Sequence, residues 1–229
     1  MRIRLAVEDM EPNHWIAWAL DLPACFSSAT SNADAVAHAP RKIADYFSWL
    51  LSHDSLIHFV NEPIEVEVVE TFHSFACSKD PDYIVNAFFE DDRRPLGYWD
   101  VEIALRVLDW TRQDLLGMIH STTQEQLTLG IKGEVRGSIA GILDHVAIAE
   151  NWYFNQLGYG LEQAQLTSDP FEKLALVRAN TREQLFKFIG NERITKNCDE
   201  LWSARKIVRR TLWHERDHTQ HIMQLLTGL

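Results

Sequence analysis

The stretch Leu212-Trp213-His214-Glu215-Arg216-Asp217-His218-Thr219-Gln220-His221-Ile222 predicts a helix that carries two histidines on its inner face. His214 and His218 are four residues apart, so their side chains lie on the same side of a helix. That side has the spacing of a core-facing surface and also includes Ile207, Thr211, Ile222 and Leu225. A buried imidazole needs a partner for each ring nitrogen. Two alternatives meet this need: a bound metal ion, or hydrogen bonds to core hydroxyls and carbonyls.

The rest of the second half also has the 3.6-residue apolar period of helices. Including the stretch above, four helices are predicted, at about 99–119, 136–157, 170–189 and 203–226. Asp169 followed by Pro170 is a typical helix start. Helices of this length joined by shorter connections predict an all-α four-helix bundle over residues 98–229.

The first half has the alternating pattern of a sheet. We expect strands at 3–7, 14–20 and 25–29, then a helix at 33–51 capped by Ser31 or Asn32, then a strand at 64–72. This β-β-β-α-β order predicts a small α+β domain over residues 1–76. Residues 77–97 are rich in charge and proline, and we expect an irregular connecting segment there.

Composition narrows the class of protein. The formal net charge is −11 and the basic clusters are short, so nucleic-acid binding is not favoured. The chain has no apolar run of the roughly 20 residues that a membrane span requires, and its first residues lack a signal peptide. We therefore expect a cytoplasmic protein without a membrane partner. A homodimer is also expected, because exposed apolar surface on a bundle often pairs with a copy of itself.

The chain has three cysteines. Cys25, Cys77 and Cys198 are widely spaced and odd in number. This pattern argues against a disulfide framework and against a cysteine-based zinc site. We expect Cys25 to be a small buried residue.

A metal site needs a third ligand beside His214 and His218. His145 is the best candidate, because its helical neighbours are apolar and a predicted helix can bring it to the last helix across a bundle core. His221 is one turn further along the last helix and can line the mouth of the site. Carboxylates that can orient the imidazoles from outside are Asp144 and Asp217.

The second half resembles the DinB-like superfamily of metal-binding four-helix bundles. In that family one ligand is a histidine of the second helix, often followed by a Glu and an aromatic, as His145 is followed by Glu150 and Trp152. The other two form the pattern Trp-His-Glu-x-x-His-x-x-Gln-Ile in the last helix, which His214 and His218 match. One position departs from the pattern: His221 stands where the family has Gln.

The first 75 residues resemble the HicB-like domain, which occurs in antitoxins. That family joins its second and third strands by an Asp-Leu-Pro-Gly-Cys turn, and here Asp21-Leu22-Pro23-Ala24-Cys25 has Ala24 in place of the glycine. The turn must then take a conformation that alanine tolerates. No DNA-binding tail follows, so the resemblance implies a small module and not toxin neutralisation.

The segment from His214 to His218 also has the His-Glu-x-x-His form of zinc proteases. Those enzymes take a third ligand from further along the chain, but only eleven residues follow His218. The glycine of the longer metzincin motif is absent as well, so we disfavour a protease.

A three-histidine site predicts reactive chemistry. Three neutral imidazoles leave coordination positions of Zn²⁺ or Ni²⁺ open to water or a substrate. The DinB-like resemblance implies transferases and isomerases that use a low-molecular-weight thiol. We therefore expect a metal-dependent hydrolase or thiol-dependent transferase with a small-molecule substrate. Glu215 is a candidate base, although it points about 100° away from His214 around the helix. The alternative is a non-catalytic binding or regulatory module whose metal is structural or vestigial.

Overall fold

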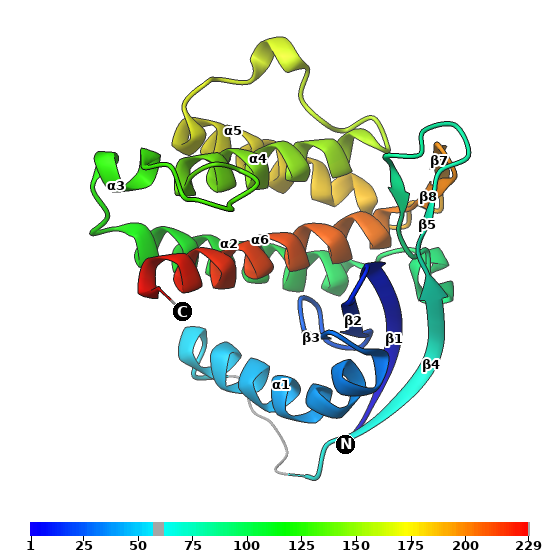
Figure 1. The fold of residues 1–229 in the computed structure, drawn as a ribbon. Coiled ribbons are helices and arrows are strands. Elements are labelled where there is room, and N and C mark those ends of the chain that lie inside the picture. Colours follow the sequence, from blue (N-terminus) through cyan, green and yellow to red (C-terminus); the bar gives the residue numbers. More distant parts are fainter. Residues whose placement is uncertain (57–61, 229) are drawn as a thin grey trace. The chain divides into compact units, whose positions relative to one another are not determined.

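The computed structural model describes residues 1–56 and 62–228, and it contains an N-terminal sheet followed by helices (Figure 1). The chain divides into two compact units. Unit 1 comprises Met1–Arg94 with Lys196–Leu201, and unit 2 comprises Pro95–Thr195 with Trp202–Leu229. Most of the segment that we expected to be a connection, 77–94, therefore groups with the sheet.

Unit 1 has the predicted β-β-β-α-β order. The elements are β1 (Arg2–Glu11), β2 (His14–Ala19), β3 (Phe26–Ala29), α1 (Asn32–His53) and β4 (Glu65–His73). The sheet order is β3-β2-β1-β4, with β1 and β2 antiparallel and β1 and β4 parallel. Helix α1 makes the crossover that a parallel pair needs and lies along one face of the sheet (Figure 1). Its buried residues Ala35, Ala39, Ile43 and Phe47 pack into the same core as Leu5, Val7 and Ala17.

The turn between β2 and β3 has a strained residue. Ala24 has a φ of 66°, in the left-handed region that favours glycine. The Cys25 N–H donates to the Leu22 carbonyl at 3.0 Å, and the Ala19 N–H donates to the Cys25 carbonyl at 3.1 Å. These bonds hold the turn in the glycine-type conformation although the residue is alanine.

The expectation that the cysteines form no disulfide is wrong. Cys77 and Cys198 are disulfide-bonded, with their Cα atoms 6.1 Å apart, and Cys25 is buried and forms no disulfide. Spacing could not reveal this pair, because 121 positions separate the two residues. Disulfides persist mainly in oxidising compartments. The pairing weighs against the cytoplasmic expectation, which stays a prediction.

Short strands surround this disulfide. They are β5 (Phe75–Ala76), β6 (Ile84–Val85), β7 (Thr195–Asn197) and β8 (Glu200–Trp202), and a 3₁₀ helix η1 (Glu90–Arg93) follows β6. The Ser78 N–H donates to the Asp199 carboxylate at 2.8 Å, and the Tyr83 hydroxyl donates to Glu200 at 2.6 Å. These contacts explain how residues 196–201 come to belong to unit 1.

Unit 2 contains the four predicted long helices as α2 (Tyr98–Ile119), α4 (Ile139–Asn155), α5 (Pro170–Leu185) and α6 (Ala204–Thr227). Helix α6 packs against α2 and α4, and α4 packs against α5 (Figure 1). The shared core includes Leu115, Ile142, Leu143, Val146, Leu174, Val177 and Ile222. Three short helices were not predicted: α3 (Gln124–Thr128), η2 (Gln163–Gln165) and η3 (Phe186–Phe188). In the described part of the chain, no helix has the length and apolar character to cross a membrane.

Candidate functional site

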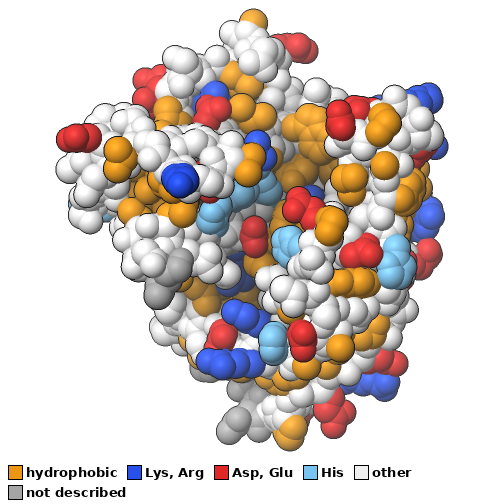
Figure 2. Space-filling view, in the orientation of Figure 1, with side chains coloured by type: hydrophobic (Ala, Val, Ile, Leu, Met, Phe, Trp, Pro, Cys, Tyr) orange, Lys and Arg blue, Asp and Glu red, His pale blue; other side chains and the backbone are white. Residues whose placement is uncertain are grey.

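Three histidines of unit 2 meet in a cluster that could hold a metal ion. His145 comes from α4, and His214 and His218 come from successive turns of α6. The Nε2 atom of His214 lies 3.1 Å from Nε2 of His145 and 3.2 Å from Nε2 of His218. Histidine side chains are grouped at the surface in Figure 2, in the region that α4 and α6 occupy in Figure 1.

Hydrogen bonding alone does not satisfy this cluster. Each Nε2 carries either a proton or a lone pair, so His214 Nε2 cannot form a hydrogen bond with both neighbours at once. A cation at the centre accepts a lone pair from all three rings. Nitrogens bound to tetrahedral zinc at its usual bond length lie about 3.3 Å apart. The observed separations are near this value, so the three residues fit a divalent metal.

The electrostatics keep these rings neutral, as metal ligands must be. Burial, followed by the Arg136 cation, lowers the pKa of His145 to about 4 against the opposing charges of Asp144 and Glu134. Burial, followed by His145, His221 and Arg136, lowers the pKa of His218 to about 3. Burial also holds the pKa of His214, only 6% exposed, well below its usual value.

The histidine rings are also in contact with an aromatic ring, and one of their other nitrogens lacks a hydrogen bond within the described part of the chain. The rings of Tyr153 and His214 are perpendicular, with centroids 5.9 Å apart. The Nδ1 atom of His218 is buried and has no hydrogen-bond partner among the residues that the structure describes. A ring whose Nε2 binds a metal carries its proton on Nδ1.

The outer positions named from the sequence lie outside the three-histidine cluster. His221 Nε2 lies 3.1 Å from the Glu134 carboxylate and is not part of the three-histidine cluster. Asp144 forms an ion pair with Lys173. Asp217 is half-buried on α6.

Glu215 points to a different part of the core from His214. Its carboxylate accepts hydrogen bonds from Arg112 at 2.5 Å, from Arg178 at 2.5 Å and from the Thr111 hydroxyl at 2.8 Å. Although burial raises its pKa, the charges of Arg178 and Arg112 outweigh this and lower the pKa overall. A fully bonded carboxylate of this kind is a poor base. The catalytic role proposed for Glu215 stays a prediction that its contacts do not favour.

Sequence reasoning missed the ionic network that Glu215 joins. Arg112 of α2, Glu150 of α4, Arg178 of α5 and Glu215 of α6 bring two positive and two negative charges together in the core. Arg178 contacts both oxygens of Glu150 at 2.9 Å and also reaches Glu215. The only indication of the network in the sequence was that these charged residues fall at helical positions that face the core. The network joins all four long helices, and its Glu150 and Glu215 lie near His214.

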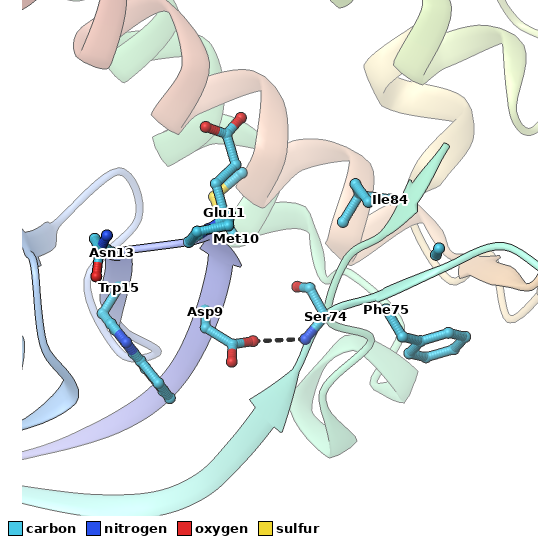
Figure 3. A pocket seen from close by; sticks show the side chains of 10 residues that line it. Asp9, Met10, Glu11, Asn13, Trp15, Ser74, Phe75 and Ile84 are labelled. Atoms are coloured by element: carbon cyan, nitrogen blue, oxygen red, sulfur yellow. Dashed lines mark hydrogen bonds between the residues drawn. The ribbon is translucent and has the colours of Figure 1, made fainter. Parts of the chain in front are cut away.

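Unit 1 has a cleft of about 360 Å³ (Figure 3). Its walls come from the β1–β2 turn and from the segment after β4, with Trp15, Phe75 and Ile84 as the large apolar members. Asp9 accepts a hydrogen bond from the Ser74 N–H at 2.6 Å and lies 2.8 Å from His73 Nδ1, so both its oxygens are engaged. The cleft therefore offers mainly apolar surface.

Comparison with known proteins gives no relative. No protein-family model matches the chain, and no curated protein or solved structure matches it. The DinB-like and HicB-like resemblances therefore stay predictions, and the function must be argued from the site itself.

Proposed function

We propose that unit 2 is a DinB-like four-helix bundle that binds a divalent metal through His145, His214 and His218. The convergence of three Nε2 atoms, which hydrogen bonds cannot satisfy together, carries this proposal. The packing of the four long helices around one apolar core and one ionic network supports the bundle. Zn²⁺ and Ni²⁺ are among the ions that imidazole ligands suit.

The activity that this site supports best is metal-dependent activation of a low-molecular-weight thiol or of water. A metal held by three protein ligands keeps a position open and lowers the pKa of a thiol or water bound there. The chain's own part is to present three neutral imidazoles in a fixed arrangement. Arg178 bonds both Glu150 of α4 and Glu215 of α6, which keeps these two helices in register. The Tyr153 ring packs against His214 and restricts its imidazole. A thiol-dependent transferase or a hydrolase with a small substrate would use such a site.

Metal analysis of protein without an affinity tag tests the site. We expect one divalent ion per chain in the wild type and none in His214→Ala. His120→Ala is the matched control, since His120 is an exposed histidine of unit 2 at the end of α2, outside the cluster. Metal content that is unchanged in His214→Ala would rule the site out.

The alternative function is a binding module with a structural metal. The apolar cleft of unit 1 favours it, because a cleft of that size can take a small ligand or a peptide side chain. Removing the metal with a chelator distinguishes a reactive ion from a structural one. Removing an ion that binds only the folded chain lowers the melting temperature in either case, so thiol binding decides between the two functions. If the ion is reactive, chelation abolishes thiol binding; if it is structural, no thiol binds at the metal and chelation changes only the melting temperature.

A further inference from the structure

An ordered loop precedes α4 and places an arginine at the histidine cluster. The loop is closed by hydrogen bonds from the Ile131 N–H to the Gly137 carbonyl at 2.8 Å and from the Arg136 N–H to the Glu134 carboxylate at 2.8 Å. The same Glu134 lies 3.1 Å from His221 of α6. These contacts fix the loop to the helix that supplies two of the three histidines.

The Arg136 guanidinium lies beside a metal-binding atom. Its Nη2 is 3.3 Å from Nε2 of His145, and no carboxylate pairs with it in the described part of the chain. Glu134, the nearest acid in the sequence, pairs with His221. An arginine without a carboxylate partner would repel a dication at the cluster. A negatively charged ligand bound to the metal would turn this repulsion into attraction.

We propose that Arg136 binds the carboxylate of the ligand that occupies the open metal position. A guanidinium matches a carboxylate with two parallel N–H donors, which a lysine does not. The thiol or substrate of this protein is then a carboxylate-bearing small molecule. This inference rests on the proposed function, because it assumes a metal at the three histidines.

The test uses Co²⁺-loaded protein, whose visible spectrum changes when a thiolate enters the coordination sphere. Mercaptoacetate carries a carboxylate and 2-mercaptoethanol does not. We expect Arg136→Gln to bind mercaptoacetate about tenfold to a hundredfold more weakly, since charge-assisted hydrogen bonds are lost. Binding of 2-mercaptoethanol should be unchanged, and Co²⁺ should bind as tightly as before or more tightly.

Two control variants make the result specific. Lys132→Gln removes one positive charge from the same loop at an exposed residue, and it should leave both thiols unaffected. Arg136→Lys keeps the charge without the paired donors and should give an intermediate loss. Equal effects of Arg136→Gln on the two thiols, or no effect on either, would overturn the role of Arg136 while the metal site stands. Failure of the wild type to bind Co²⁺ would overturn the proposed function and this inference with it.

Discussion

Ala24 adopts a backbone conformation that costs an L-residue about 1 kcal/mol or more. Glycine adopts it freely, so we expect Ala24→Gly to stabilise unit 1 by about 1 kcal/mol, measured as the free energy of unfolding in urea. Ala44→Gly is the matched control, because Ala44 is exposed in the middle of α1. There the same substitution should cost about 1 kcal/mol. A loss of stability in both variants would show that the turn is not strained.

The histidine pKa values set how metal binding depends on pH. Three ordinary histidines, each with a pKa near 6.5, would lose about 10³-fold in apparent affinity between neutral pH and pH 5.5, because protons compete for each ring. Here the pKa is lowered to about 4 for His145 and about 3 for His218, so the rings stay neutral as the pH falls to these values. We expect less than tenfold weakening at pH 5.5 in a competition titration with a chelator. A fall of three orders of magnitude would contradict the buried, neutral state of the rings.

Much of the histidine cluster could be predicted from single residues, and its surroundings could not. The four-residue spacing of His214 and His218 and the apolar neighbours of His145 follow from helical periodicity. Arg136 lies in a loop, where no regular period predicts which way a side chain points. Its approach to His145 depends on hydrogen bonds of Glu134 that the sequence does not reveal.

At the scale of the helices, the four long helices of unit 2 contact one another partly through the buried ionic network and not through apolar side chains alone. Burying charges is costly, so such a network stabilises a fold little compared with an apolar core, and breaking it is strongly destabilising. Its four members come from four helices, so only one register of these helices pairs every charge. The long helices were predictable from their period, whereas α3 and the strands β5 to β8 are too short to show one.

Removing one member of the ionic network should lower the free energy of unfolding strongly, because it leaves an uncompensated buried charge. Arg178→Met leaves Glu150 and Glu215 buried with Arg112 as their remaining cation, and we expect a loss of about 3–5 kcal/mol in the free energy of unfolding. Arg182→Met is the matched control, because Arg182 lies one turn further along α5 in an exposed pair with Asp109. That change should cost less than about 1 kcal/mol. Similar losses in the two variants would mean that the buried charges do not depend on one another.

Across the whole molecule, the division into units does not follow the chain from end to end. Residues 196–201 belong to unit 1 although they lie between α5 and α6 of unit 2. A sequence-based boundary near residue 76 or 97 misses such an insertion, because nothing local to Cys198 marks its partner. The homodimer also stays a prediction, since a contact between two copies cannot be seen within one chain. The cytoplasmic compartment stays a prediction against which the disulfide weighs.

The Cys77–Cys198 disulfide ties residues 196–201 to unit 1, and its effect on stability can be measured. Because 121 positions separate Cys77 from Cys198, the bond closes a long loop and restricts the unfolded chain, which the chain-entropy model values at up to about 5 kcal/mol. We expect a reductant to shift the urea midpoint of the wild type to lower concentration. Cys77→Ser/Cys198→Ser should unfold at the lower midpoint with or without reductant. Cys25→Ser, which leaves the disulfide in place, should still respond to the reductant as the wild type does.

A thiol count decides whether the bond is present before these curves are compared. Denatured wild-type protein should offer one reactive thiol without reductant, that of Cys25, and three after reduction. Three reactive thiols without reductant would show that Cys77 and Cys198 are not bonded to each other. In that case the contacts of Asp199 and Glu200 would help to hold residues 196–201 in unit 1 without a covalent bond, and the reductant would leave the urea midpoint of the wild type unchanged.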